Sequence, residues 1–249
     1  MTQTIRSATQ VAFVTGANRG IGLQTAEELG KEGVTVVLGV RDPAKAEATL
    51  AALRTQGVTA EAVVWDAARP ETDAAVAKHL GERYGRLDIL VNNAGVLKEP
   101  LMGNSTASIS ETVLRETFDT NFFAVVRLTQ ALLPLLKKAP AARIVNLSSV
   151  LGSLTLHSAS DSPIGATKAF AYNASKTALN AFTVHLAAEL AGTNIKVNSA
   201  HPGWVKTELG GVHAPMEIAD SARTSVRLAL LGDDGPTGRF FHENDALPW

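Results

Sequence analysis

The chain has 249 residues, of which 45% are hydrophobic and 19% charged, the composition of an ordinary globular protein. A net charge of −1 argues against nucleic acid or an anionic membrane as a partner, and the lack of cysteine excludes disulfides, thiolate catalysis and cysteine-ligated zinc. No apolar stretch is long enough to span a bilayer, and the polar residues 1–10 lack the apolar core of a signal peptide. We therefore expect a cytoplasmic protein that does not bind membranes.

Short apolar segments alternate with helical patterns along the whole chain. The predicted strands are residues 11–15, 34–38, 60–65, 87–92, 143–149 and 195–200, with a short one near 239–241. The predicted helices are residues 21–32, 43–56, 70–84, 110–136, 172–191 and 216–231. This alternation implies βαβ units, and the nearly continuous apolar strands imply that helices cover both faces. The prediction is an α/β fold with a doubly wound parallel sheet, in a single domain over residues 1–249.

The first predicted strand runs directly into a glycine-rich turn, residues 15–22, and a helical pattern follows. Strand, glycine turn and helix together are typical of dinucleotide binding, because the backbone approaches a pyrophosphate and the helix N-terminus faces its negative charge. A turn without a ligand is the alternative. The residues expected to contact the dinucleotide are Gly16, Asn18, Arg19, Gly20, Ile21 and Gly22.

Two arginines indicate which dinucleotide is bound. Many NAD-binding units place an acid at the end of the second strand, whereas this chain has Val40 followed by Arg41. A guanidinium suits a 2′-phosphate, and Arg19 in the glycine turn supplies a second positive group. The prediction is NADPH rather than NADH, with solvated surface arginines as the alternative. Asp42 could reach a ribose hydroxyl, so dual specificity stays open.

Polar residues also follow the third and fourth predicted strands. Asp66 could accept a hydrogen bond from an adenine amino group, or it could form a turn or cap the next helix. Two amides and two small residues follow the fourth strand, where the backbone can press against a ribose and the amides can tie neighbouring strands together. These residues are Asn92, Asn93, Ala94 and Gly95.

Tyr172 and Lys176 lie four residues apart at the start of a helical pattern, so they share one face. A phenol normally titrates near pH 10, and a nearby ammonium lowers that pKa. Tyr172 could then exchange a proton with an alcohol or alkoxide. Ser148 and Ser149 end the fifth predicted strand, where a hydroxyl could bind a substrate oxygen. Asn121 is a polar amide inside a long predicted helix, where it must bind backbone or water.

The combination resembles the short-chain dehydrogenase/reductase family. The matching pieces are residues 15–22, Asp66, residues 92–95, Asn121, Ser149, residues 172–176 and residues 201–203, in the family's order. The resemblance implies a Rossmann-type sheet of about seven strands with helices on both faces. The closing segment, from Gly203 to the terminal Trp249, looks like that of carbonyl-reductase-type members.

The resemblance also implies roles for individual residues. Tyr172 would be the general acid/base, Ser149 would stabilise the substrate oxygen, and Lys176 would lower the pKa of Tyr172 and hold the nicotinamide ribose. Asn121 would position a water in a proton relay. Ser149 is preferred to Ser148 because the second serine of such a pair is usually the catalytic one. The expected contacts of the nicotinamide and its phosphate are Pro202, Gly203, Val205 and Thr207.

One departure from the family's pattern is the stretch between Ser149 and Tyr172, which is longer than in many relatives. In monomeric carbonyl reductases a longer insert covers a surface used for dimerisation, so a monomer is expected here; alternatively, this insert shapes the substrate pocket. His157 and Asp161 within it could suggest a metal pair, but four-residue spacing in a loop favours a solvated loop and no metal.

The favoured function is NADPH-dependent reduction of a small ketone or aldehyde. An acyl-thioester ketoreductase is the first alternative, although no Lys/Arg cluster lies in the pocket loops to meet an acidic carrier protein. A non-catalytic NADP-binding sensor is the second, and Tyr172 with Lys176 argues against it because a sensor needs no activated phenol. The sequence does not identify the substrate.

Overall fold

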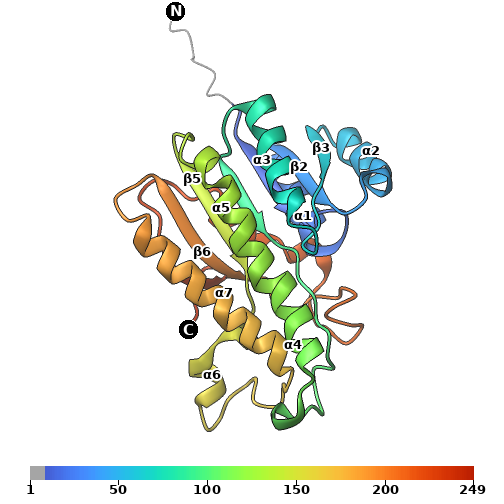
Figure 1. Cartoon of the computed structure of the whole chain (residues 1–249), viewed down its shortest axis with the longest axis vertical. Helices are drawn as coiled ribbons and strands as arrows, with labels where there is room; N and C mark the ends of the chain where they lie inside the picture. Colours follow the sequence, from blue (N-terminus) through green and yellow to red (C-terminus); the bar gives the residue numbers. More distant parts are fainter. Residues whose placement is uncertain (1–8) are drawn as a thin grey trace, which may run out of the picture.

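The computed structural model describes residues 9–249, arranged around one sheet (Figure 1). Residues 1–8, part of the polar N-terminal segment, lie outside the described residues. The sheet order is β3-β2-β1-β4-β5-β6-β7-β8, parallel except for β8. The strands are β1 (Val11–Thr15), β2 (Thr35–Val40), β3 (Ala60–Val64), β4 (Ile89–Asn92), β5 (Ala142–Leu147), β6 (Ile195–His201), β7 (Arg239–His242) and β8 (Asp245–Ala246). The predicted doubly wound α/β fold is confirmed.

Helices connect the parallel strands. The α-helices are α1 (Gly20–Lys31), α2 (Glu47–Thr55), α3 (Glu71–Tyr84), α4 (Glu111–Phe118), α5 (Ala124–Leu136), α6 (Leu154–Ser158), α7 (Phe170–Glu189) and α8 (Arg223–Ala229). The shorter turns are the 3₁₀ segments η1 (Pro43–Ala46), η2 (Thr106–Ser108), η4 (Val150–Gly152) and η5 (Ile218–Asp220), and the π-helical turn η3 (Asp119–Phe123).

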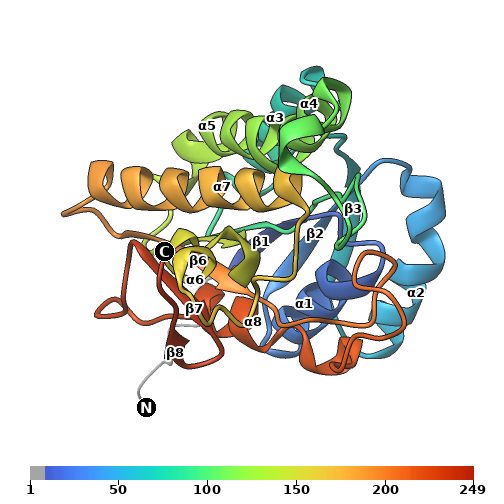
Figure 2. The same ribbon diagram turned by 90° about the horizontal axis from the view of Figure 1, so that it is seen from below.

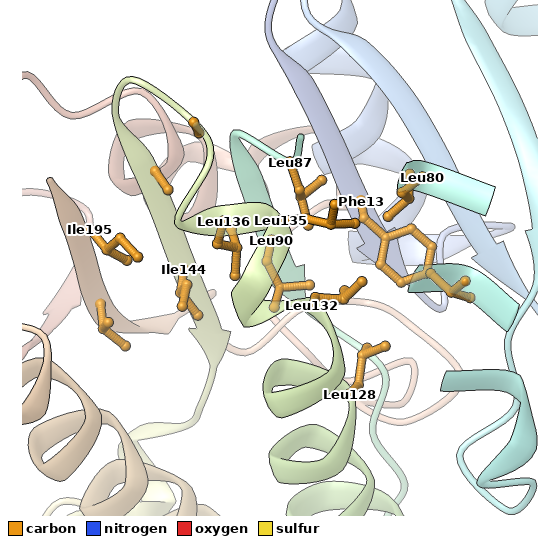
Figure 3. Close-up of a cluster of buried hydrophobic side chains, with 14 of the residues drawn as sticks. Phe13, Leu80, Leu87, Leu90, Leu128, Leu132, Leu135, Leu136, Ile144 and Ile195 are labelled. Atoms are coloured by element: carbon orange, nitrogen blue, oxygen red, sulfur yellow. The ribbon is translucent and has the colours of Figure 1, made fainter. Parts of the chain in front are cut away.

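The helices form two layers, with α3, α4, α5 and α7 on one side of the sheet and α1, α2 and α8 on the other (Figure 2). Successive β1 residues alternate between the two cores: Val11 and Phe13 belong to one cluster, Ala12 and Val14 to the other. Figure 3 shows the first cluster, in which Phe13 and leucines of α3 and α5 meet. Burial on both faces explains the continuous apolar strands of the sequence.

Three predicted elements differ from the structure. The expected helix over 216–231 is only η5 and α8, because Met216 is held extended by backbone hydrogen bonds with Trp204 and Lys206. The expected helix over 110–136 is divided by the π-turn η3. The sheet also has an eighth strand, β8, which pairs antiparallel with β7 after a turn in which Glu243 has φ +47°; the expected number of about seven strands agrees with this closely.

The chain reverses its direction of winding between β1 and β4, which are hydrogen-bonded neighbours. In open α/β sheets, ligands bind beyond the carboxyl ends of the strands at such a point. The glycine turn follows β1 there, and residues 93–96 follow β4. Across residues 9–249, no helix combines the length and the apolar character that crossing a membrane requires.

Candidate active site

A cavity of about 1820 Å³ lies along the carboxyl edge of the sheet. It brings together most of the residues that the sequence predicted for the site. Those that line it are Gly16, Asn18, Arg19, Gly20, Ile21, Gly22, Arg41, Asp66, Asn93, Ala94, Gly95, Ser149, Tyr172, Lys176, Pro202, Gly203, Val205 and Thr207. Asn92 and Asn121 are fully buried beside it and do not line it.

The glycine turn has the backbone geometry of a phosphate cradle. Gly16 and Gly20 have φ of +64° and +57°, a region that favours glycine. A Cβ on Gly22 would lie 2.4 Å from Nδ2 of Asn93 and 2.6 Å from the carbonyl oxygen of Gly16, so no side chain fits. Helix α1 begins at Gly20, and its first three residues, whose N–H groups have no partner within the helix, line the cavity. The residues present therefore fit a dinucleotide pyrophosphate.

Thr15, which the sequence analysis did not select as a site residue, fixes the turn relative to β4. Its hydroxyl oxygen accepts hydrogen bonds from the backbone N–H of Asn93 at 2.9 Å and of Ala94 at 3.0 Å. The Asn93 side chain returns a bond from Nδ2 to the Thr15 carbonyl at 2.7 Å. A hydroxyl at the last position of a strand was the available signal, but its partners are distant in sequence.

The expectation that Asn92 contacts the cofactor is wrong for its side chain. Asn92 is 2% exposed, and its Nδ2 donates to Oδ1 of Asn146 at 2.9 Å and to Oγ1 of Thr129 at 3.1 Å. The amide therefore ties β4 to β5 and α5 beneath the cavity. The alternative strand-tying role predicted for these amides applies to Asn92, whereas Asn93 lines the cavity.

The two arginines differ in their contacts. Arg19 forms an ion pair with Glu208, on the segment that follows β6. Arg41 is exposed at the end of β2, lines the cavity and, within residues 9–249, has no ion pair. Asp42 accepts a hydrogen bond from the N–H of Ala44 at 3.1 Å and caps η1. Arg41 is therefore available to an anionic ligand.

Asp66 follows β3 and forms a turn, which is one of the alternatives predicted for it from the sequence. Its Oδ1 accepts a hydrogen bond from the N–H of Ala68 at 3.0 Å. The residue is half-buried and also lines the cavity, so its carboxylate remains accessible to a ligand. The turn role and the adenine role are compatible in this geometry.

Ser149 and Ser148 have different partners at the end of β5. Ser149 Oγ accepts from the N–H of Leu151 at 3.2 Å, and Ser149 is hydrogen-bonded to Tyr172. Ser148 Oγ instead donates to the carbonyl of Lys176 at 3.5 Å. The hydroxyl directed at Tyr172 is therefore that of Ser149.

Tyr172 occupies the third position of α7, and Oε1 of Glu99 accepts its backbone N–H at 3.1 Å. Burial raises the pKa of Tyr172 to about 12, while the hydrogen bond with Ser149 acts in the lowering direction. Lys176 was expected to lower the pKa of Tyr172, but it does not do so in the protein without cofactor. Its Nζ lies 5.6 Å from the centroid of the Tyr172 ring and donates to the carbonyl of Leu147 instead. The phenol is therefore protonated at neutral pH.

Lys176 is 4% exposed, and its Nζ donates to the carbonyl of Leu147 at 2.7 Å. Burial lowers the pKa of Lys176 to about 8. The lysine lies close to the β4 loop, since a Cβ placed on Gly95 would be 3.6 Å from its Nζ and 3.4 Å from Oδ1 of Asn121. The fold thus brings three distant segments to one point.

The Asn121 side chain lies in the π-turn η3, and its amide has three partners. Oδ1 accepts from the N–H of Val96 at 2.8 Å, and Nδ2 donates to the Val96 carbonyl at 2.9 Å and to Ser175 Oγ at 3.0 Å. Ser175 Oγ in turn donates to the carbonyl of Tyr172 at 2.7 Å. Asn121 therefore joins the β4 loop to α7, which satisfies the requirement that a mid-helix amide bind backbone.

The segment after β6 closes the other side of the cavity. Gly203 has φ +92°, and Thr207 faces the glycine turn, with its Cγ2 3.6 Å from a Cβ placed on Gly20. His201 also lines the cavity, although the sequence analysis gave it no role. Burial, and secondarily His242, lower its pKa to about 3, and its Nδ1 accepts from the N–H of Val150 at 3.3 Å. His201 is therefore a neutral acceptor that positions η4.

The insert before Tyr172 forms η4, α6 and a series of turns, and it contacts the first turns of α7. The carbonyl of Gly152 accepts from Thr177 Oγ1 at 3.0 Å, and Asn173 Nδ2 lies 3.3 Å from Nε2 of His157. His157 and Asp161 belong to no cluster of metal-ligating side chains; the structure shows none among residues 9–249.

Comparison with known proteins yields one consistent result. A family model described as short chain dehydrogenase matches residues 10–217. The chain is 30% identical to Short-chain dehydrogenase/reductase 1 of Saponaria officinalis, over 96% of this chain and 95% of that protein. It is 37% identical to a protein of Streptomyces virginiae named as a candidate ketoacyl reductase of a monensin polyketide synthase. The match covers 82% of this chain and 74% of that protein.

A solved structure extends the likeness to the fold. The chain superposes on an NADPH-bound carbonyl reductase from chicken fatty liver with a TM-score of 0.84 and 29% sequence identity. The match covers 98% of this chain and the whole of the other. The likeness to this NADPH-bound structure therefore extends over nearly the whole fold.

Proposed function

Because the chain belongs to the short-chain dehydrogenase family, we propose that it reduces a ketone or aldehyde to the alcohol with Asn121, Ser149, Tyr172 and Lys176 as its functional residues. It is an oxidoreductase acting on C=O and CH–OH groups with NADP(H). The observation that carries the proposal is a single cavity containing both the glycine turn and the Ser149–Tyr172–Lys176 group. Bound NADPH supplies the hydride.

Tyr172 donates its phenolic proton to the carbonyl oxygen as negative charge develops there. The raised pKa keeps this proton in place at neutral pH. Ser149, hydrogen-bonded to Tyr172, donates to the same oxygen and stabilises its charge. Lys176 places a cation over the Tyr172 ring at 5.6 Å, and it would hold the nicotinamide ribose when the cofactor is bound. Asn121 is a positioning residue, because its side chain is fully engaged with Val96 and Ser175.

The cofactor would lie along the cavity from the glycine turn toward Tyr172. Gly16, Gly20 and Gly22 would hold the pyrophosphate, and Arg41 would receive the 2′-phosphate. Asp66 would meet the adenine. The remaining contacts would come from Asn18, Arg19, Ile21, Asn93, Ala94, Gly95, Pro202, Gly203, Val205 and Thr207.

The test compares the wild type with Tyr172→Phe. NADPH oxidation is followed with a panel of ketones and aldehydes, and NADPH binding is measured separately by fluorescence. We expect both proteins to bind NADPH and the variant to lose at least about 100-fold in kcat, because phenylalanine lacks the hydroxyl that gives its proton to the carbonyl oxygen. Binding by both proteins with turnover by neither would favour a sensor instead.

An acyl-thioester ketoreductase is the second candidate, favoured by the identity to the Streptomyces virginiae protein. The two candidates share the reaction and differ in the substrate. A 3-ketoacyl thioester assayed beside simple ketones separates them, since higher kcat/KM for the thioester, and higher still on an acyl carrier protein, would favour the second.

A further inference from the structure

The cavity has two chemically different ends. The glycine-turn end contains Arg41, Asp66 and the polar backbone of residues 16–22. The end beside Tyr172 is enclosed by apolar side chains from four loop segments. These residues, called the apolar wall below, are Leu101, Met102, Leu151, Pro163, Ile164 and Trp204.

Hydrogen bonds tie three residues of the apolar wall to neighbouring segments, and one of these bonds reaches Ser149. The carbonyl of Leu101 accepts from the N–H of Lys168 at 2.9 Å, which ties the loop after β4 to the segment preceding α7. The N–H of Leu151 donates to Ser149 Oγ at 3.2 Å. Trp204 Nε1 donates to the carbonyl of Gly210 at 2.8 Å, which leaves its ring with no other polar group to offer. A substrate whose carbonyl reaches Tyr172 must place the rest of its body against this wall.

The cationic side chains near the apolar wall are already paired with carboxylates. Three ion pairs there involve residues that line the cavity, and Asp119, a carboxylate that also lines it, has no ion pair within residues 9–249. The pairs are Lys98 with Glu116 at 3.1 Å, Lys206 with Glu217, and Glu208 with Arg19. His201 is neutral at ordinary pH. Within residues 9–249, the lining cations without an ion pair are Lys176, which is hydrogen-bonded to Leu147, and Arg41 at the opposite end.

We propose that the substrate is a ketone or aldehyde with an apolar body and no carboxylate or phosphate near its carbonyl, selected by the apolar wall. This inference rests on the proposed function and narrows it. Moving an anion from water to an apolar surface without a counter-ion is strongly unfavourable, whereas an apolar group gains from leaving water. Within residues 9–249, the cation without an ion pair near Tyr172 is Lys176, which is 4% exposed and already donates to the carbonyl of Leu147, so it is poorly placed to receive a substrate anion.

The experiment uses two ketones that differ in one charge, methyl para-acetylbenzoate and para-acetylbenzoate. We expect kcat/KM of the wild type to be at least about 100-fold higher for the neutral ester. Both compounds are also titrated into the protein in the presence of NADP+, with quenching of tryptophan fluorescence as the readout, and the ester should bind more tightly. Equal or better turnover and binding of the carboxylate would overturn the inference.

A pair of variants tests whether the wall sets this preference. Met102 and Leu154 are almost equally exposed, 64% and 63%, but only Met102 lines the cavity. Met102→Lys should raise kcat/KM for the carboxylate, because it adds an unpaired cation. The ratio of kcat/KM for the ester to kcat/KM for the carboxylate should therefore fall at least about tenfold. Leu154→Lys should leave the preference unchanged. Equal effects of the two variants would overturn the role of the wall.

Failure of the inference and failure of the proposed function give different results. If the ketone function is wrong, neither compound is reduced although NADPH binds, while the fluorescence titration still ranks the ester against the carboxylate. If only the inference is wrong, both compounds are reduced and the carboxylate is not disfavoured. The same titration therefore decides the inference in either case.

Discussion

Arg41 is the residue on which selectivity between the two nicotinamide cofactors depends. Arg41 lines the cavity and forms no ion pair with the residues that the structure describes, while Arg19 is paired with Glu208. Arg41→Ala should weaken NADPH binding about tenfold and leave NADH binding unchanged, because only NADPH carries the 2′-phosphate. Dissociation constants for both cofactors measure this effect. Arg54→Ala, which removes an exposed arginine outside the cavity, is the control; equal losses for NADPH and NADH in Arg41→Ala would refute the assignment.

His201 gives the folded protein a sensitivity to acid. The pKa of His201 is lowered from 6.5 to about 3. Between pH 6.5 and about pH 3, this histidine is therefore protonated in the unfolded chain and neutral in the folded protein. The stabilisation is complete above pH 6.5 and is lost as the pH falls toward 3. At pH 5 the loss amounts to about 2 kcal/mol.

Urea unfolding of the wild type and of His201→Asn is measured at about pH 7.5 and about pH 5. These values lie roughly one unit above and 1.5 units below the ordinary histidine pKa. Asparagine keeps an acceptor near the position of Nδ1, which receives the N–H of Val150, but it does not titrate. The free energy of unfolding of the variant should therefore fall less between the two pH values. Parallel decreases in both proteins would show that His201 does not cause the acid sensitivity.

At the scale of the elements, two helical glycines differ in the space around them, because one is packed closely against other residues and the other is not. Gly22 and Gly81 both lie inside helices, α1 and α3. An added Cβ on Gly22 meets Asn93 and the backbone of Gly16, whereas on Gly81 its nearest neighbour is Leu135 Cδ2 at 3.7 Å. The same substitution should therefore have opposite effects at the two positions.

Gly22→Ala should lower the free energy of unfolding by about 1–3 kcal/mol and weaken NADPH binding at least about tenfold, because the turn and Asn93 must separate. Gly81→Ala should raise the free energy of unfolding by about 0.5–1 kcal/mol and leave binding unchanged. Denaturant unfolding and fluorescence titration measure the two effects. Unchanged NADPH binding in Gly22→Ala would contradict the cradle geometry.

At the scale of the whole molecule, we predict that the protein is a monomer. The insert over η4 and α6 packs on the first turns of α7, at Asn173 and Thr177, and shields part of that helix. Size-exclusion chromatography with light scattering should give a mass close to 26.1 kDa. A stable tetramer would contradict this, and Val184→Glu, at an exposed position of α7, would then show whether that helix forms the interface.

Features that depend on neighbouring residues could be predicted from the sequence, whereas features that depend on distant partners could not. The strands, the glycine turn and the Tyr172–Lys176 spacing depend on local patterns, so the parallel α/β fold was predicted, and the predicted site residues other than Asn92 and Asn121 line the cavity. The length of the helix near 216–231 and the contribution of Thr15 were missed, and for Asn92 the strand-tying role was left open beside a cofactor contact. Each depends on a partner distant in sequence: Asn146 for Asn92, Trp204 for Met216, and Asn93 for Thr15.

The sequence by itself determined that a strand, a glycine turn and a helix form a dinucleotide-binding unit, because the steric demands of glycine and the apolar periodicity are properties of neighbouring residues. Only the tertiary structure decided which charges near the site remain unpaired and what pKa values its buried groups have. Those properties depend on burial and on partners that the fold brings together, such as Ser149 with Tyr172 and Glu208 with Arg19.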